Sequence, residues 1–193
     1  MGTKGSANRQ RIVDAADRLF YSRGYNQTSF SDISDETGIP RGNFYYYFKT
    51  KEDILSAVVE ARVSEFAQLL EQCTQGSSDP RERLLALVNI PISNEPQVLQ
   101  YGCPIGSLST ELSKEQAQEV SAAKLTAVFD LIRDWCIEQF TALGFEQQAR
   151  DYALDLMARM QGVSLIANVY HDSKFLHRGT RELEDWVRQV TGH

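Results

Sequence analysis

The stretch from Ser29 to Lys51 constrains the fold more than any other part of the chain. Ser29 and Asp32 have the spacing of a capping box, so a short helix is expected to begin near Phe30. Gly38 would end that helix, and Pro40 would begin a second one, because the missing N–H of proline is not needed in a first turn. Two short helices joined by a tight turn with glycine predict a helix-turn-helix, the unit that places its second helix in the major groove of DNA.

The second predicted helix contains five successive aromatic residues, from Phe44 to Phe48. A helix that only packs against a core does not need aromatic side chains on every face. Phe44 and Phe48 are four residues apart and can share the inward face, which leaves the three tyrosines between them to point elsewhere. Phenol hydroxyls suit phosphate oxygens, Gly42 would let the backbone approach a surface, and Asn43 could reach a base edge or a phosphate.

The segment GIPRGNFYYYFKTKEDIL resembles the recognition-helix signature of the TetR family of bacterial transcriptional regulators, and the resemblance extends from about Arg9 to Leu55. It implies an all-α protein with an N-terminal three-helix helix-turn-helix domain and a larger helical domain for ligand binding and dimerisation. The expected division is a disordered lead-in at residues 1–8, a DNA-binding domain at 9–48 and an effector-binding and dimerisation domain at 49–193. Pro40 and Arg41 depart from the family, in which many members carry a small hydroxyl residue followed by lysine.

The resemblance and the residue chemistry together predict nine contacts with double-stranded operator DNA. Base edges are assigned to Asn43, Tyr47 and, as a further candidate, Arg41. Phosphates are assigned to Ser29, Tyr45, Tyr46 and Lys51, with Gly42 permitting close approach. Thr28 is either a phosphate contact or only a residue of the helix entry.

The distribution of charge is compatible with DNA binding, although the net charge is -6. Residues 1–50 carry seven basic and five acidic residues. The other 143 residues carry thirteen basic and twenty-one acidic residues. No acid lies between Arg41 and Lys51. Because phosphate binding responds to the local field, a basic head on an acidic body suits a DNA-binding protein.

Other classes of protein find no support in the sequence. We expect no membrane association, because no apolar run reaches the length of a bilayer span and no basic-then-apolar leader is present. Cys73, Cys103 and Cys136 are far apart and odd in number, which predicts no disulfide framework, no metal site and a reducing cytoplasm. The absence of a Gly-rich phosphate loop, HExxH or GxSxG predicts a protein that is not an enzyme and needs no cofactor.

Capping and periodicity predict the helices that follow the aromatic run. Thr50 and Asp53 form a second capping box, and an apolar stripe from there to Cys73 predicts a long helix that joins head and body. Asp79 would cap a further helix that ends at Pro91, with a loop from there to Gly102. A short helix is expected from Pro104 to Leu112, and a longer one, capped by Ser113 and Gln116, to Gly144. The last 49 residues predict a pair of helices.

Tyr101 to Leu108 is the second informative stretch, because Gly106 costs about 1 kcal/mol relative to alanine within a helix. The glycine indicates either tight helix packing or the wall of a ligand pocket with Cys103 and Ser107 facing it. The segment resembles the Gly-Cys-Pro/Leu motif of one TetR branch, whose cysteine in some members responds to electrophiles or oxidants; a buried, inert cysteine is the alternative. The expected pocket residues are Tyr101, Cys103, Ser107, Phe129, Trp135, Met157, Met160 and Gln161.

In the TetR family the last two helices pair with their twofold copies in a homodimer. The apolar rows on these helices predict that the interface contains Tyr152, Leu156, Val163, Ala167, Phe175, Leu183, Trp186 and Val187. Core, dimer and ligand roles remain open for Met157, Met160 and Gln161. The sequence thus predicts a regulator, most often a repressor, that a small-molecule effector releases from a palindromic operator. The alternatives are a thiol sensor acting through Cys103, or a helical module that binds a protein partner.

Overall fold

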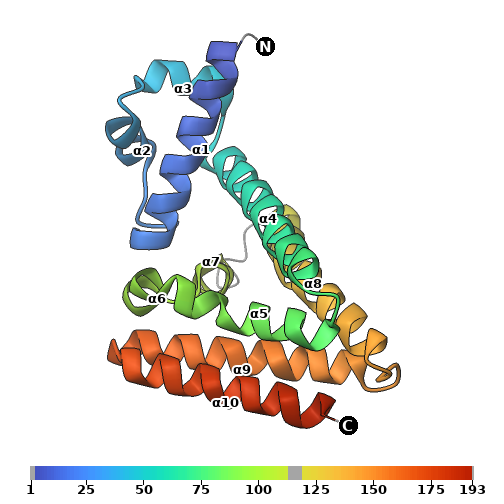
Figure 1. Cartoon of the computed structure of the whole chain (residues 1–193). Helices are drawn as coiled ribbons and strands as arrows, with labels where there is room; N and C mark the ends of the chain where they lie inside the picture. The colour runs from blue at the N-terminus through green and yellow to red at the C-terminus, as the bar shows by residue number, and fades with distance from the viewer. Residues whose placement is uncertain (1–2, 113–118, 193) are drawn as a thin grey trace. The chain divides into compact units, whose positions relative to one another are not determined.

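The computed structural model describes residues 3–112 and 119–192, and their side chains except at residues 3, 4, 41 and 119–125. These residues form only α-helices and the loops between them, which confirms the all-α prediction (Figure 1). The helices are α1 (Thr3–Arg23), α2 (Phe30–Thr37), α3 (Arg41–Tyr47), α4 (Lys51–Gly76), α5 (Pro80–Ser93), α6 (Glu95–Tyr101), α7 (Pro104–Leu112), α8 (Glu119–Ala142), α9 (Ala149–Tyr170) and α10 (Ser173–Thr191). The predicted cap of Ser113 with Gln116 lies outside the described residues.

Two compact units divide the chain. The first unit comprises Met1–Ser64 and Ser107–Ala127, and the second comprises Glu65–Gly106 and Val128–His193. The first boundary between the units therefore falls within α4, whereas the predicted domain boundary was at residue 48. The early turns of α4 pack into the core of the first unit. Residues from Ser107 onward also join the first unit, although the sequence assigned them to the effector domain.

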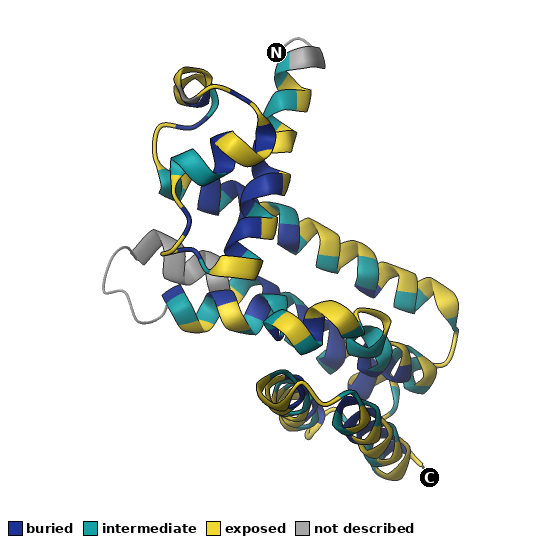
Figure 2. Cartoon of the chain, turned by 90° about the vertical axis from the view of Figure 1, so that its left-hand side faces the viewer, coloured by how far each residue is buried: buried dark blue, intermediate teal, exposed yellow. Residues whose placement is uncertain are grey.

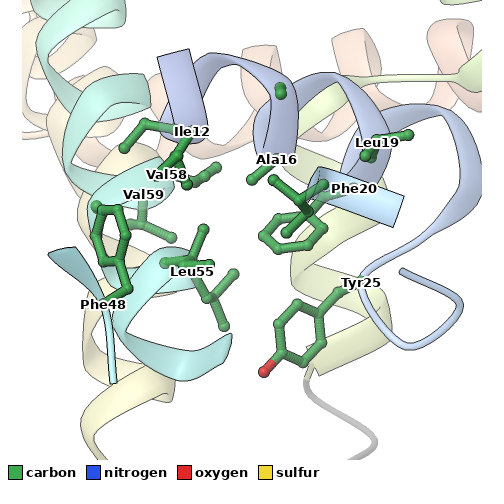
Figure 3. Close-up of a cluster of buried hydrophobic side chains, with 14 of the residues drawn as sticks. Ile12, Ala16, Leu19, Phe20, Tyr25, Phe48, Leu55, Val58 and Val59 are labelled. Atoms are coloured by element: carbon green, nitrogen blue, oxygen red, sulfur yellow. The ribbon is translucent and has the colours of Figure 1, made fainter. Parts of the chain in front are cut away.

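The core of the first unit is built from α1, α2, α4 and α7, with Phe44 of α3 and Phe48 directly after it. Figure 3 shows side chains of α1 facing Leu55, Val58 and Val59 of α4, with Phe48 beside them. Leu108 and Leu112 of α7 complete this buried cluster. Each large apolar side chain contributes roughly 1.5–3 kcal/mol by leaving water. In Figure 2 the buried residues, in dark blue, lie where these helices meet.

The first helix begins earlier than expected. The sequence predicted a disordered lead-in over residues 1–8, but α1 starts at Thr3. Two contacts explain the extension: Asn8 Nδ2 lies 3.5 Å from the Tyr47 hydroxyl, and the Arg9 guanidinium lies 5.0 Å from the centre of the Phe48 ring. The prediction missed them because both partners are distant in sequence.

The second unit contains a helix where the sequence predicted a loop. α5 continues through Pro91 to Ser93, and α6 begins at Glu95, with Pro96 in its first turn. A proline in a first turn lacks only an N–H that has no intrahelical partner, so Pro96 starts a helix instead of preventing one. Asn94 lies between the two helices, and its side-chain amide donates to the carbonyl of Ile90 at 3.1 Å.

α9 and α10 lie side by side in the second unit (Figure 1). A Cβ added to Gly179 of α10 would lie 2.8 Å from both methyl groups of Val163 on α9, so only glycine allows the observed approach. Val98 of α6 packs against Ala167 and Leu176 on the pair. No helix in the described part of the chain has the length and apolar character of a bilayer span.

Candidate nucleic-acid interface

The first helix of the predicted reading unit is fixed by its own cap. Ser29 Oγ accepts the N–H of Asp32 at 3.3 Å, and Asp32 Oδ2 accepts the N–H of Ser29 at 2.7 Å, which confirms the predicted capping box. Hydrogen bonds from Ser29 hold the pKa of Asp32 below its ordinary value. α2 ends as predicted at Gly38, whose φ of 66° lies in the left-handed region.

The turn between α2 and α3 is held by buried polar groups. Ser34 Oγ donates to the carbonyl of Ile39 at 2.8 Å, and the Ile39 N–H donates to Thr37 Oγ1 at 3.2 Å. Pro40 is the N-cap of α3, with φ −57° and ψ 139°, so it precedes the helix by one residue instead of beginning it. These bonds fix the direction in which α3 leaves the turn.

α3 presents one face to the core and the other to solvent. Phe44 is 0% exposed and Phe48 3% exposed, which confirms the predicted inward face. Tyr45 and Tyr46 are 58% and 69% exposed, and Tyr47 is partly buried. Large aromatic side chains with this exposure are available to a partner outside the chain.

Neighbouring rings hold the exposed tyrosines in place. The Tyr45 ring stacks on Phe30 of α2, with a centroid distance of 6.2 Å and an interplanar angle of 19°. The Tyr46 ring meets Tyr47 edge to face at 4.9 Å. The hydroxyls are thus presented by rings whose orientation is already set.

Gly42 and Asn43 form the exposed beginning of α3. A Cβ on Gly42 would meet no atom of the chain within 4 Å. Packing inside the chain therefore does not require a glycine at this position, where it costs about 1 kcal/mol relative to alanine. The side chain of Arg41, also predicted to contact DNA, lies outside the described residues.

Two predicted DNA contacts face the protein instead. Thr28 is 1% exposed and its hydroxyl donates to the carbonyl of Gly24 at 2.8 Å, so it belongs to the helix entry. Lys51 Nζ donates to the carbonyls of Tyr25 at 3.0 Å and Thr28 at 3.2 Å. The loop before α2 supplies these partners, and a phosphate contact of Lys51 stays a prediction.

Lys49 is a basic residue that the predicted set omitted. Its side chain is exposed just beyond α3, and its ammonium donates to the carbonyl of Tyr45 in the last turn of that helix. The absence of acids between Arg41 and Lys51 was the signal that could have included it.

Two predicted effector residues, Cys103 and Gln161, meet at the start of α7. Gln161 Nε2 donates to Cys103 Sγ at 3.3 Å, and a Cβ on Gly106 would lie 2.6 Å from Gln161 Oε1. Gly106 therefore permits close packing of the Gln161 side chain, one of the two interpretations that the sequence left open. Trp135 is buried elsewhere, with its indole N–H donating to Thr74 Oγ1 at 3.0 Å.

A groove of about 500 Å³ runs between the end of α4 and α5. Its lining mixes apolar and polar groups: Leu69, Gln72, Cys73, Gly76, Ser77, Glu82, Ala86 and Ile90. None of the eight residues predicted to line an effector pocket borders this groove.

The predicted dimer residues lie mostly against their own chain. Leu156, Ala167, Leu183 and Val187 are buried, while Tyr152, Val163, Phe175 and Trp186 are partly buried. The four buried residues pack within their own chain, and the predicted interface stays a prediction. α9 has apolar residues both on the face that packs within the chain and on the face exposed to solvent. Periodicity alone could not tell these two faces apart.

The outer face of α9 carries large exposed apolar side chains. These are Leu154, Leu165, Ile166, Val169 and Tyr170. Ala158 and Gly162 lie on the same i, i+4 row as Leu154 and Ile166 and are also exposed. A Cβ on Gly162 would meet nothing within 4 Å.

The sequence model described as "Bacterial regulatory proteins, tetR family" matches residues 12–58. An uncharacterized HTH-type transcriptional regulator in the lacX 3′ region of Lactococcus lactis is 31% identical over 172 residues, covering 87% of each chain. An uncharacterized HTH-type transcriptional regulator of Mycobacterium tuberculosis is 30% identical over 188 residues, covering 91% of this chain and 93% of its own.

Solved structures share the fold along nearly the whole chain. A TetR transcriptional regulator from Legionella pneumophila matches with a TM-score of 0.82 at 22% identity, covering 98% of this chain and 97% of its own. The reduced form of NemR from Escherichia coli matches with a TM-score of 0.80 at 20% identity, covering 93% and 96%. At these identities the likeness concerns the fold alone.

Proposed function

Since the chain belongs to the TetR family of bacterial regulatory proteins, we propose that it regulates transcription by placing the exposed face of α3 in the major groove of operator DNA. The observation that carries this proposal is the division of α3 between a buried Phe44 and an exposed row of Gly42, Asn43, Tyr45 and Tyr46. The row ends beside Lys49, in a segment without acids.

Each exposed residue of α3 has a role that fits its chemistry. Asn43 reads a base edge, since its amide can pair with adenine in both directions. The hydroxyls of Tyr45 and Tyr46 bind phosphates, and Lys49 adds a positive charge nearby. Gly42 permits close approach of the backbone, which accounts for a glycine that packing inside the chain does not require.

We place three further predicted contacts around this centre. Ser29 is exposed at the start of α2 and can approach a phosphate while its hydroxyl stays in the cap. Tyr47 is partly buried and its hydroxyl accepts a hydrogen bond from Asn8 Nδ2 at 3.5 Å, so we give it a secondary role. Arg41 remains a candidate for a base edge.

A homodimer would carry two copies of α3 to successive half-sites. We propose that the dimer forms through the outer face of α9, because Leu165, Ile166, Val169 and Tyr170 are exposed there. Small residues at Ala158 and Gly162 would let a second helix come close. Operator half-sites should then repeat at roughly 34–36 Å, one turn of DNA, or a multiple of that distance.

A small molecule bound in the second unit would control operator binding, most often by releasing a repressor. The groove between α4 and α5 has a volume within the range of small-molecule sites. The predicted lining around Cys103 and Gln161 is the other candidate.

We propose that the chain acts by binding and not by catalysis, and that it acts in the cytoplasm, where bacterial operators lie.

The test is selection from random duplex DNA with the full-length, ligand-free protein at low and at physiological salt. We expect a near-palindromic consensus, and the Asn43→Ala variant should select a consensus that is relaxed at one position in each half-site. If the folded dimer enriches no sequence at either salt, the exposed tyrosines belong to a protein-binding surface and the proposed function is wrong.

A further inference from the structure

One face of α4 and one face of α5 form the groove between these helices. On α4 the lining residues are Leu69, Gln72, Cys73 and Gly76. Residues three, four and seven positions apart share a helix face, so these four residues form one continuous wall. A Cβ on Gly76 would meet no atom within 4 Å, which agrees with open space beside the last turn of α4.

The wall on α5 follows the same spacing rule. Glu82, Ala86 and Ile90 lie four residues apart, and Ser77 adds a lining residue in the loop that joins the two helices. The helical stretch from Glu82 to Ile90 is roughly 12 Å long, at a rise of about 1.5 Å per residue. All of this lining belongs to the second unit, and the volume of about 500 Å³ suits an elongated small molecule.

The lining changes from polar to apolar along the groove. Ser77 and Glu82 lie at the end next to the connecting loop, whereas Leu69 and Ile90 are the lining residues farthest from that loop along α4 and α5. Leu69 and Ile90 are only partly buried, so a ligand that covers them removes further apolar surface from water. A ligand that fills the groove therefore has a polar group at the loop end and an apolar body at the other end.

Glu82 is the only charged residue among the described residues that line the groove. The arginines on either side of it bind other groups: Arg81 Nε donates to the Thr191 hydroxyl at 2.8 Å, and Arg83 Nε donates to the Ser77 carbonyl at 2.8 Å. Neither arginine belongs to the lining. The exposed carboxylate of Glu82 therefore makes the loop end of the groove negative, so that this end attracts a cation and repels an anion.

We propose that the groove binds an elongated organic cation, with its ammonium group beside Glu82 and its apolar body against Leu69 and Ile90. Cys73 in the α4 wall does not alter this charge preference, because burial raises the pKa of its thiol and keeps the thiol neutral near pH 7. That the cation acts as the effector rests on the proposed function, whereas its binding in the groove requires neither DNA nor a dimer.

Three rigid molecules of nearly the same shape test the charge preference: para-phenylbenzylamine is the cation, para-phenylbenzyl alcohol is neutral and para-phenylbenzoate is the anion. Isothermal titration calorimetry with the full-length protein without DNA gives their Kd values, and we expect the ammonium to bind most tightly and the carboxylate most weakly. Glu82→Gln should weaken binding of the ammonium about threefold and leave the alcohol unchanged. Glu71→Gln removes an exposed charge of α4 outside the lining and should change neither Kd. Equal Kd values for the three molecules would overturn the proposal.

Two further measurements test the location of the bound ammonium. Ala86→Trp fills the groove from an exposed position of α5 and should abolish binding, whereas Ala67→Trp, at an exposed position of α4 outside the lining, should leave it unchanged. Saturating para-phenylbenzylamine should also slow the alkylation of Cys73 by iodoacetamide and leave that of Cys103 unchanged. If the ammonium binds equally well to Ala86→Trp and does not protect Cys73, it binds elsewhere and the proposal is wrong.

The regulatory role of the cation has its own readout. Saturating para-phenylbenzylamine should raise the Kd for the selected operator in the natural protein and have no effect in Ala86→Trp. An unchanged Kd in the natural protein would overturn the role of the bound cation as effector. If no operator is selected, the proposed function fails while the calorimetric result stands, so the two failures are distinguishable.

Discussion

The ammonium of Lys51 lies 3.0 Å from the carbonyl oxygen of Tyr25 and 4.0 Å from the centre of the Tyr25 ring. It also donates to Thr28, and the Tyr25 hydroxyl in turn donates to Glu52 at 3.3 Å. Lys51 therefore joins the first turn of α4 to the loop that precedes α2. A lysine at the beginning of a helix suggests a phosphate contact. Here the ammonium also stabilises the first unit, because it binds the carbonyls of Tyr25 and Thr28.

Lys51→Met should lower the free energy of unfolding by about 1–3 kcal/mol, because two backbone carbonyls lose a charged donor. Urea unfolding followed by circular dichroism measures this loss. The variant should leave the dependence of DNA affinity on salt unchanged, while Lys49→Met should reduce the salt slope by about 1 with little change in stability. A reduced slope with unchanged stability for Lys51→Met would restore it as a phosphate contact.

Asn43→Ala should lower discrimination at one base pair of each half-site by about 1–3 kcal/mol, since the amide is the side chain on α3 best suited to a base edge. Competition between the selected operator and single-base variants measures this effect. Tyr46→Phe is the matched control, because it removes one hydroxyl and should weaken all sequences alike. Unchanged discrimination in Asn43→Ala would move base reading to another residue of α3.

Ile166→Glu should convert the dimer to a monomer at micromolar concentrations, because a carboxylate would be buried without a partner in the interface. Sedimentation equilibrium of the free protein measures the change. Ala67→Glu places the same charge at an exposed position of α4 and should remain dimeric. A dimer that survives Ile166→Glu would show that another surface mediates association.

Gly179→Ala should lower the free energy of unfolding by about 1–3 kcal/mol, because its methyl group would lie 2.8 Å from Val163 and would force α9 and α10 apart. Thermal unfolding measures the effect. Gly76→Ala adds the same methyl group to open space near the end of α4 and should be neutral or slightly stabilising. Similar stabilities for the two variants would contradict the close packing of α10 on α9.

Cys136 should be the slowest of the three cysteines to react with iodoacetamide at pH 8. Burial raises its pKa to about 12, so little thiolate forms, and burial also raises the pKa of Cys73. Mass spectrometry during the reaction gives the order of modification, and denatured protein should lose that order. Because the folded pKa exceeds the ordinary value, the stability from the buried thiol is complete below about pH 9 and falls as the pH rises toward 12. Rapid labelling of Cys136 in folded protein would contradict its burial.

Local sequence determined the features that depend on residues a few positions apart. The capping boxes of Ser29 with Asp32 and of Thr50 with Asp53 follow from a three-residue spacing, and both are present. Phe44 and Phe48 were assigned to the core from their place in the aromatic run. These features were predictable because the partner groups lie within one helical turn of each other.

Only the tertiary structure decided which side chains have partners within the protein and which remain exposed to a partner such as DNA. Thr28 and Lys51 carry groups that suit DNA, yet the loop before α2 provides their partners. Three further features depend on segments far apart in the sequence: the outer face of α9, the helix after Asn94, and the hydrogen bonds from the Tyr25 and Asn26 amides to Glu111. A periodic apolar pattern gives the faces of a helix, but the direction of each face is fixed by what the rest of the chain packs against it.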